Sequence, residues 1–235
     1  MTALLDVDKL VRFSRSSPGA DKLYKTIGYG LDAAAYLFAP TAQPETAQNI
    51  HALASNISMA RYVLRFTGGL EAYTALTKGL WSCEDDDEHV QRLVRLQALS
   101  MVVYHPLEHV SYVGFVAPTL LNVDAMRFSR LSCRAWGVYV LLDIYASALR
   151  IRALKAKKKQ LLARKDLTDD ERSTLLTCIR DRCRELKYVQ LRNLLNAGPC
   201  IQWSFERKIL SDRLVSFLCA AEAAIGLWRA WTMAE

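Results

Sequence analysis

Apolar residues recur at helical spacing along most of the chain, and the alternation typical of strands is not found. Capping residues, prolines and glycines divide this pattern into segments. The expected helices cover residues 20–38, 46–76, 90–121, 125–165, 168–195 and 210–233. The sequence therefore predicts an all-α protein of about six helices, with residues 1–80 as an N-terminal region and residues 81–235 as a second helical region.

Local signals indicate where several helices begin. Ser17 and Pro18 have the order of an N-cap followed by a first-turn proline, and Pro44 can open the next helix. Thr168 and Glu171 have the spacing of a capping box, which predicts a new helix after residue 168.

Prolines and glycines indicate where helices end or bend. Pro40 should stop the helix over 20–38, and Gly68–Gly69 should weaken the helix over 46–76. Pro106 should kink the following helix. Residues 197–199 (Ala-Gly-Pro) should break the chain before the last helix.

Hydrophobic residues make up 51% of the 235 positions and charged residues 23%, which excludes a disordered chain. The formal net charge of +7 favours an anionic partner, either a membrane surface or a nucleic acid. The six cysteines are scattered without the spacing of a zinc or redox clip, and we interpret them as reduced core thiols. Asp6 and Asp8 argue against a cleaved secretory signal and predict that the chain starts in the cytosol.

No segment has the composition of a standard membrane span. A bilayer core requires about 20 mostly apolar helical residues. The longest windows without Asp, Glu, Lys or Arg are residues 46–60 and 109–123, and Glu222 interrupts the window between Arg213 and Arg229. The alternatives are a soluble helical protein or a membrane protein that lies in the interface with imperfect spans.

The segment 57–77 has two distinct faces. At about 100° per residue from Ile57, one face lies between about 140° and 240° and the opposite face carries Arg61 and Arg65. The first face consists of Met59, Tyr62, Val63, Phe66, Leu70 and Tyr73. Such a helix can insert shallowly among lipid head groups while its arginines bind phosphates, although the same stripe could also pack in an ordinary core.

A basic run without acidic residues covers positions 150–165. Its eight cationic residues are Arg150, Arg152, Lys155, Lys157, Lys158, Lys159, Arg164 and Lys165. Such a run can bind anionic lipid or nucleic acid, serve as a targeting signal, or be a solvated helix end. Nucleic acid is the weaker alternative because the run lacks interleaved stacking aromatics.

Three residues match a zinc motif. His105, Glu108 and His109 have the H-x-x-E-H spacing in which two histidines bind zinc and the glutamate acts as a base. Pro106 should distort the turn that aligns both imidazoles, and no third ligand is obvious. We therefore expect a hydrogen-bonded histidine pair, with no metal, no cofactor and no enzymatic activity.

Five blocks in chain order resemble the peroxin-11 family of peroxisomal membrane proteins. The blocks are Gly19, Asp21, Lys22, Lys25 and Tyr29; Ser58, Arg61, Arg65 and Phe66; Tyr104, Pro106, Glu108, His109 and Tyr112; Arg127, Ser129, Arg130 and Trp136; and Asn193, Leu194, Leu195, Pro199, Trp203, Leu210, Ser211, Asp212, Gly226 and Leu227. The third block is most similar to the gamma (C-type) branch, with Tyr112 in place of a tryptophan. Asn196 and Gln202 depart from an acidic residue and a histidine common in the last block.

The resemblance implies a protein of the peroxisomal membrane, or of the glycosomal membrane in a kinetoplastid, that elongates the membrane and promotes fission. It implies peroxisomal membrane lipids and the dynamin-related fission machinery as partners. The run 150–165 would then be recognised by the import receptor for peroxisomal membrane proteins. Homo-oligomers are expected through the small residues of the last helix, which are Ala220, Ala221, Ala223, Ala224 and Gly226.

Two further functions stay open at this point. A channel for small metabolites would require Glu108, Asp143 and Glu222 to face a water-filled lumen. A soluble helical adaptor would carry the same helical pattern without binding membrane.

Overall fold

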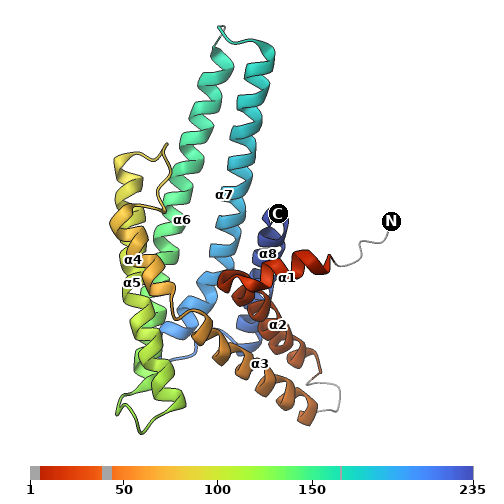
Figure 1. Ribbon diagram of the computed structural model, residues 1–235, viewed down its shortest axis with the longest axis vertical. Coiled ribbons are helices and arrows are strands. Elements are labelled where there is room, and N and C mark those ends of the chain that lie inside the picture. Colours follow the sequence, from red (N-terminus) through yellow and green to blue (C-terminus); the bar gives the residue numbers. More distant parts are fainter. Residues whose placement is uncertain (1–5, 39–43, 165, 235) are drawn as a thin grey trace.

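The computed structural model describes residues 6–38, 44–164 and 166–234, and every regular element within these ranges is a helix (Figure 1). The helices are α1 (Val7–Arg15), α2 (Ser17–Phe38), α3 (Pro44–Leu64), α4 (Gly68–Lys78), α5 (Glu88–Val116), α6 (Ala125–Ala163), α7 (Asp169–Ser204) and α8 (Asp212–Met233). The all-α prediction is confirmed, with eight helices in the described ranges where about six were expected.

Two differences account for the higher number. The side chain of Asp6 accepts a hydrogen bond from the amide of Lys9 and caps the short helix α1, which the sequence pattern did not predict. The helix predicted over 46–76 is divided into α3 and α4 by a turn at residues 65–67, directly before the glycine pair expected to be weak.

The predicted helix starts at Pro44 and Thr168 are confirmed, and both hydrogen bonds of the capping box between Thr168 and Glu171 are present. The predicted break at 197–199 is wrong, because α7 continues through Pro199 to Ser204. The chain turns later instead, where the side-chain oxygen of Gln202 accepts hydrogen bonds from the amides of Ile209 at 2.9 Å and Leu210 at 2.8 Å. Pro40 lies outside the described residues.

Helices α5, α6 and α7 follow one another as antiparallel neighbours, and the α6–α7 hairpin extends beyond the rest of the molecule (Figure 1). Helix α4 packs along α5, and α2 and α3 form a second hairpin. Helix α2 also packs on α8, which in turn packs on α7. The first long helix of the chain therefore lies beside the last.

The apolar core between α5 and α6 is narrow. It is formed by Val90, Leu93 and Val94 of α5 against Ala146 of α6. Trp81, which precedes α5, packs against this cluster. Small and medium side chains allow α5 and α6 to lie close along their length.

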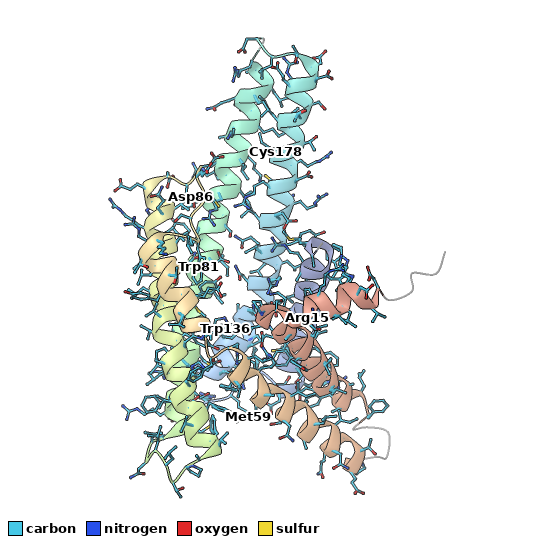
Figure 2. All side chains as sticks on the ribbon, viewed as in Figure 1. Arg15, Met59, Trp81, Asp86, Trp136 and Cys178 are labelled. Atoms are coloured by element: carbon cyan, nitrogen blue, oxygen red, sulfur yellow. The ribbon has the colours of Figure 1, made fainter. Side chains whose placement is uncertain are left out.

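A buried ion pair fixes the chain before α5 to α6. Arg150 donates to both carboxylate oxygens of Asp86, at 2.8 and 2.5 Å, and its Nη2 also donates to the carbonyl oxygen of Trp81 at 3.4 Å. Asp86 and Trp81 are labelled in Figure 2. Burial alone would raise the pKa of Asp86, but the hydrogen bonds from Arg150 and from the Cys83 amide lower it below its ordinary value. Arg150 therefore helps to hold the fold together.

Within the described residues, α8 is the one helix long and apolar enough to cross a membrane. The expectation that every apolar window falls short is thus wrong for α8 by length and composition. The core helix of a soluble protein can have the same properties, and 33% of the apolar window of α8 is buried inside the bundle.

Candidate functional site

The apolar residues of the segment 57–77 lie largely on the outside of the molecule. Four of them form what we call the outer apolar face: Val63, Phe66, Leu70 and Tyr73, with exposed fractions of 57%, 70%, 69% and 58%. They come from the last turn of α3, the turn at 65–67 and the first two turns of α4. Met59 and Tyr62 are half-buried, and the ring of Tyr62 stacks on Tyr112 of α5. Exposed groups of large apolar side chains are typical of surfaces that bind a membrane or a protein.

Arg61 points into the bundle and is only 5% exposed. Its Nε donates to one carboxylate oxygen of Asp21 in α2 at 2.9 Å, and its Nη2 lies 3.5 Å from the other. The guanidinium also lies over the ring of Tyr29, 5.5 Å from its centroid. Arg61 therefore joins α3 to α2.

Arg65 makes a second internal ion pair. Its Nη2 lies 2.8 Å from Oε1 of Glu108 in α5, and the hydroxyl of Tyr104 donates to the same oxygen. Burial alone would lower the pKa of Arg65, but the neighbouring Tyr104, Glu108 and Asp21 raise it above its ordinary value. The guanidinium therefore stays charged, and it ties the end of α3 to α5.

The two faces of this segment thus have unusual orientations, with the cationic side inward and much of the apolar side outward. A surface helix of a soluble protein has the opposite arrangement. Both arginines already bind carboxylates, so lipid phosphates could reach them only if these ion pairs opened. Phosphate binding by Arg61 and Arg65 stays a prediction.

The turn at 65–67 brings the start of α4 against α5. A Cβ atom at Gly68 would lie 2.3 Å from Cε1 of His105, far inside van der Waals contact. A Cβ atom at Gly69 would lie 3.4 Å from Cβ of His105, which is an ordinary contact. The ring of Phe66 meets the ring of His109 edge-on, with centroids 4.7 Å apart. Only a glycine fits at position 68 without displacing the His105 ring.

We expect the substitution Gly68→Ala to lower the free energy of unfolding by about 1–3 kcal/mol, because the added methyl group overpacks the contact with His105. Gly69→Ala is the matched control, and it should be neutral or stabilising by up to about 1 kcal/mol because alanine favours the helix. Urea unfolding followed by far-UV circular dichroism measures both. Equal stability of the two variants would contradict the close approach at Gly68.

His105, Glu108 and His109 lie together on α5, where it contacts the turn at 65–67 and the start of α4. Helix α5 is continuous through Pro106, so the expected distortion does not separate the two histidines. One ligand atom of each residue lies within 4.8 Å of the others. Burial lowers the pKa of His105 to about 4, with electrostatic interactions with His109 and Arg65 acting in the same direction, so its ring is neutral at physiological pH.

The basic run lies on the part of α6 that belongs to the extended hairpin (Figure 1). Arg150 is half-buried in its pair with Asp86 and is not part of a free cationic surface. The exposed members are Arg152, Lys155, Lys157, Lys158, Lys159 and Arg164. Two of these pair with acids, Lys157 with Asp85 at 3.1 Å and Arg164 with Asp166 at 2.6 Å. Lys165 lies outside the described residues.

A polar pocket of about 420 Å³, partly open to the outside, is lined mainly by residues of α6, α7 and α8. Asp143 and Glu222 line it, together with Lys25 and Arg192. Glu108 does not line this pocket, because it faces Arg65. Of the three acids that a channel lumen would require, Asp143 and Glu222 therefore line the same pocket, and Glu108 does not.

Fold and site together define an all-helical protein with two features. Ion pairs are buried between its helices, and a group of aromatic and aliphatic side chains is exposed on its surface. A family model described as Peroxisomal biogenesis factor 11 (PEX11) matches residues 7–231, which is nearly the whole chain. The chain belongs to this family, and the resemblance drawn from the five sequence blocks is confirmed. No curated protein and no solved structure matches the chain. The family gives the protein a role in peroxisome biogenesis, associates it with peroxisomes and is not an enzyme class.

The sequence did not predict the partners of the inward charges. The blocks that carry the resemblance meet in the structure, where Arg61 pairs with Asp21 and Arg65 pairs with Glu108. A signal was present, because Asp21 with Lys25 and Arg61 with Arg65 are spaced four apart within predicted helices that are otherwise rich in apolar residues. Buried charges of this kind require an opposite charge nearby.

Proposed function

We propose that this protein shapes and elongates the peroxisomal membrane through its outer apolar face and thereby promotes peroxisome division. The observation that carries the proposal is the outward orientation of Val63, Phe66, Leu70 and Tyr73, each more than half exposed. Full burial of one such side chain in an apolar phase contributes roughly 1.5–3 kcal/mol. Insertion of this face into one leaflet would expand that leaflet and favour curvature.

The internal ion pairs of Arg61 and Arg65 support this function by fixing the orientation of the face. A folded body that holds the inserted face limits its rotation away from the membrane surface. The exposed cations of the run 152–164 supply a second contact, either with anionic lipid or with the import receptor for peroxisomal membrane proteins.

Self-association and the fission machinery belong to the same proposal. Of the small residues of α8, Ala223 and Gly226 are buried inside the bundle, whereas Ala221 and Ala224 are exposed and free to contact a second copy. Oligomers would add the wedges of several copies on one membrane, where the dynamin-related fission machinery would act.

The test of the proposal is the double substitution Phe66→Glu with Leu70→Glu, assayed by co-sedimentation with anionic liposomes and by electron microscopy of tubules. Two carboxylates on the face should weaken liposome binding by about 100-fold, since roughly 3 kcal/mol of apolar burial is lost, and should abolish tubules. The control is Leu141→Glu with Leu191→Glu, two exposed leucines of α6 and α7 that lie outside both the outer apolar face and the basic run. Wild-type tubulation by the face variant would refute the proposal.

A metabolite channel is the second candidate, and the polar pocket lined by Lys25, Asp143, Arg192 and Glu222 favours it. In membrane proteins, ionisable side chains that face a water-filled cavity are typical of solute pathways. Solute flux through the reconstituted protein separates this function from membrane shaping, because shaping alone requires no flux.

A further inference from the structure

We propose that His105, Glu108 and His109 bind a divalent transition-metal ion of the zinc class between α5 and the turn that joins α3 to α4. This inference differs from the expectation drawn from the sequence, and it does not depend on the proposed membrane function. It rests on two observations: one polar atom of each side chain has no hydrogen-bond partner, and neighbouring groups bind the other polar atom of His109 and of Glu108.

Three buried atoms at this point have no hydrogen-bond partner among the described residues: His105 Nδ1, Glu108 Oε2 and His109 Nε2. Buried polar atoms nearly always have a partner, so three together in one cluster are unusual. Two imidazole nitrogens and one carboxylate oxygen are a known donor set of catalytic zinc sites, which keep a fourth position for water. Because two of the three donors are nitrogens, the set favours zinc, cobalt, nickel or copper over magnesium or calcium.

The spacing of the three residues fits such an ion after a small adjustment. His105 Nδ1 lies 4.0 Å from Glu108 Oε2, and each of the three residues offers one ligand atom within 4.8 Å of those of the other two. Ligands of a tetrahedral zinc ion with bonds of about 2.0–2.1 Å are about 3.3–3.5 Å apart. The difference is within the reach of side-chain rotation.

The remaining polar atoms of two of these residues are held by neighbours that orient the free donors. His109 Nδ1 lies 2.5 Å from the carbonyl oxygen of His105, which leaves Nε2 as the atom with the free lone pair. Glu108 Oε1 is bound by Arg65 and by the hydroxyl of Tyr104, which leaves Oε2 free. Hydrogen bonds and ion pairs to the outer atoms of ligand residues orient those residues in metal sites. The ion pair between Arg65 and Glu108 is a contact of this type.

The position of the cluster gives the ion a structural consequence. Gly68 lies against the ring of His105, and Phe66 contacts the ring of His109. A bound ion would fix both imidazoles and therefore the surface on which the α3–α4 turn rests. Metal binding should raise the unfolding midpoint of the full-length protein.

The experiment is a titration of purified, metal-stripped, full-length protein with Co²⁺, whose visible absorption reports ligand type and coordination. We expect one equivalent to bind with the spectrum of nitrogen and oxygen ligands. His109→Gln should weaken binding about 100-fold or more because a direct ligand is lost. Tyr104→Phe should weaken it by about 10- to 100-fold because an outer contact is lost. His89→Gln, which removes a histidine of α5 outside the cluster, is the matched control and should bind like the wild type.

Three results would overturn the inference: no saturable Co²⁺ uptake by the wild type, wild-type affinity in His109→Gln, or a thiolate charge-transfer band that persists in His109→Gln. Far-UV circular dichroism without metal shows whether each variant is folded. If His109→Gln does not fold, Glu108→Gln replaces it in the same comparison, and binding at wild-type affinity by that variant counts against the site.

Discussion

Replacement of Glu222 by alanine is expected to lower the free energy of unfolding by about 3–5 kcal/mol. This side chain of α8 has no exposed surface, and it binds Lys25 of α2 and Arg192 of α7. Arg192 donates to one carboxylate oxygen through Nε at 2.9 Å and through Nη2 at 2.6 Å. Without the carboxylate, Lys25 and Arg192 would stay partly buried with no opposite charge beside them. The cost of desolvating these two unpaired cations destabilises the variant.

Urea unfolding of the full-length protein, followed by far-UV circular dichroism, measures this loss. Glu206→Ala is the matched control, because Glu206 pairs with Arg130 but is 80% exposed, so its removal should leave the stability unchanged within error. A Glu222→Ala variant as stable as Glu206→Ala would show that this ion pair does not hold α2, α7 and α8 together.

The same contacts bear on whether α8 crosses a bilayer. The helix is long and apolar enough for a span, yet Glu222 is buried and pairs with Lys25 of α2 and Arg192 of α7, which are partly buried. A membrane-crossing α8 that left the bundle would take a carboxylate into lipid without its cations, at a cost of several kcal/mol. The shallow contact through the outer apolar face carries no such cost.

Much of the helical framework could be predicted from local signals. Pro44 and the pair Thr168 and Glu171 mark helix starts because their fixed backbone angle or side-chain oxygens act within one turn of the chain. The end of α7 could not be predicted in this way. Pro199 removes one backbone hydrogen bond but leaves the helix intact, and the turn is placed by the contact of Gln202 with the amides of Ile209 and Leu210.

The candidate site could also be predicted only in part from local signals. Angles of 100° per residue predict the apolar residues and the two arginines on opposite faces. In the structure four of the six apolar residues are exposed, although Met59 and Tyr62 are half-buried and the turn at 65–67 interrupts the helix on which that calculation depends. The direction in which each face points could not be predicted. It is set by Asp21, which is 40 residues from Arg61 in sequence, and by Glu108 of α5. Spacing within one helix contains no information about such distant partners.

The orientation of the face leads to the second large effect. Arg61→Asp should lower the free energy of unfolding by about 3–5 kcal/mol, because it places a second carboxylate beside the partly buried Asp21. Exchange of both charges, Asp21→Arg with Arg61→Asp, restores an attractive pair and should recover at least about half of the lost stability. Asp21→Arg alone is the matched single variant, and urea unfolding of the three variants and the wild type gives the coupling energy of the pair.

The exchange also separates the internal role of Arg61 from phosphate binding. If the ion pair with Asp21 orients the outer apolar face, the double variant should regain liposome binding together with stability, because Val63, Phe66, Leu70 and Tyr73 are unchanged. If Arg61 instead opens from Asp21 to hold a lipid phosphate, the double variant should be stable and yet bind anionic liposomes less well, since an aspartate stands where the phosphate ligand was. Recovery of stability without recovery of binding would therefore contradict the purely internal role and identify Arg61 as a lipid contact.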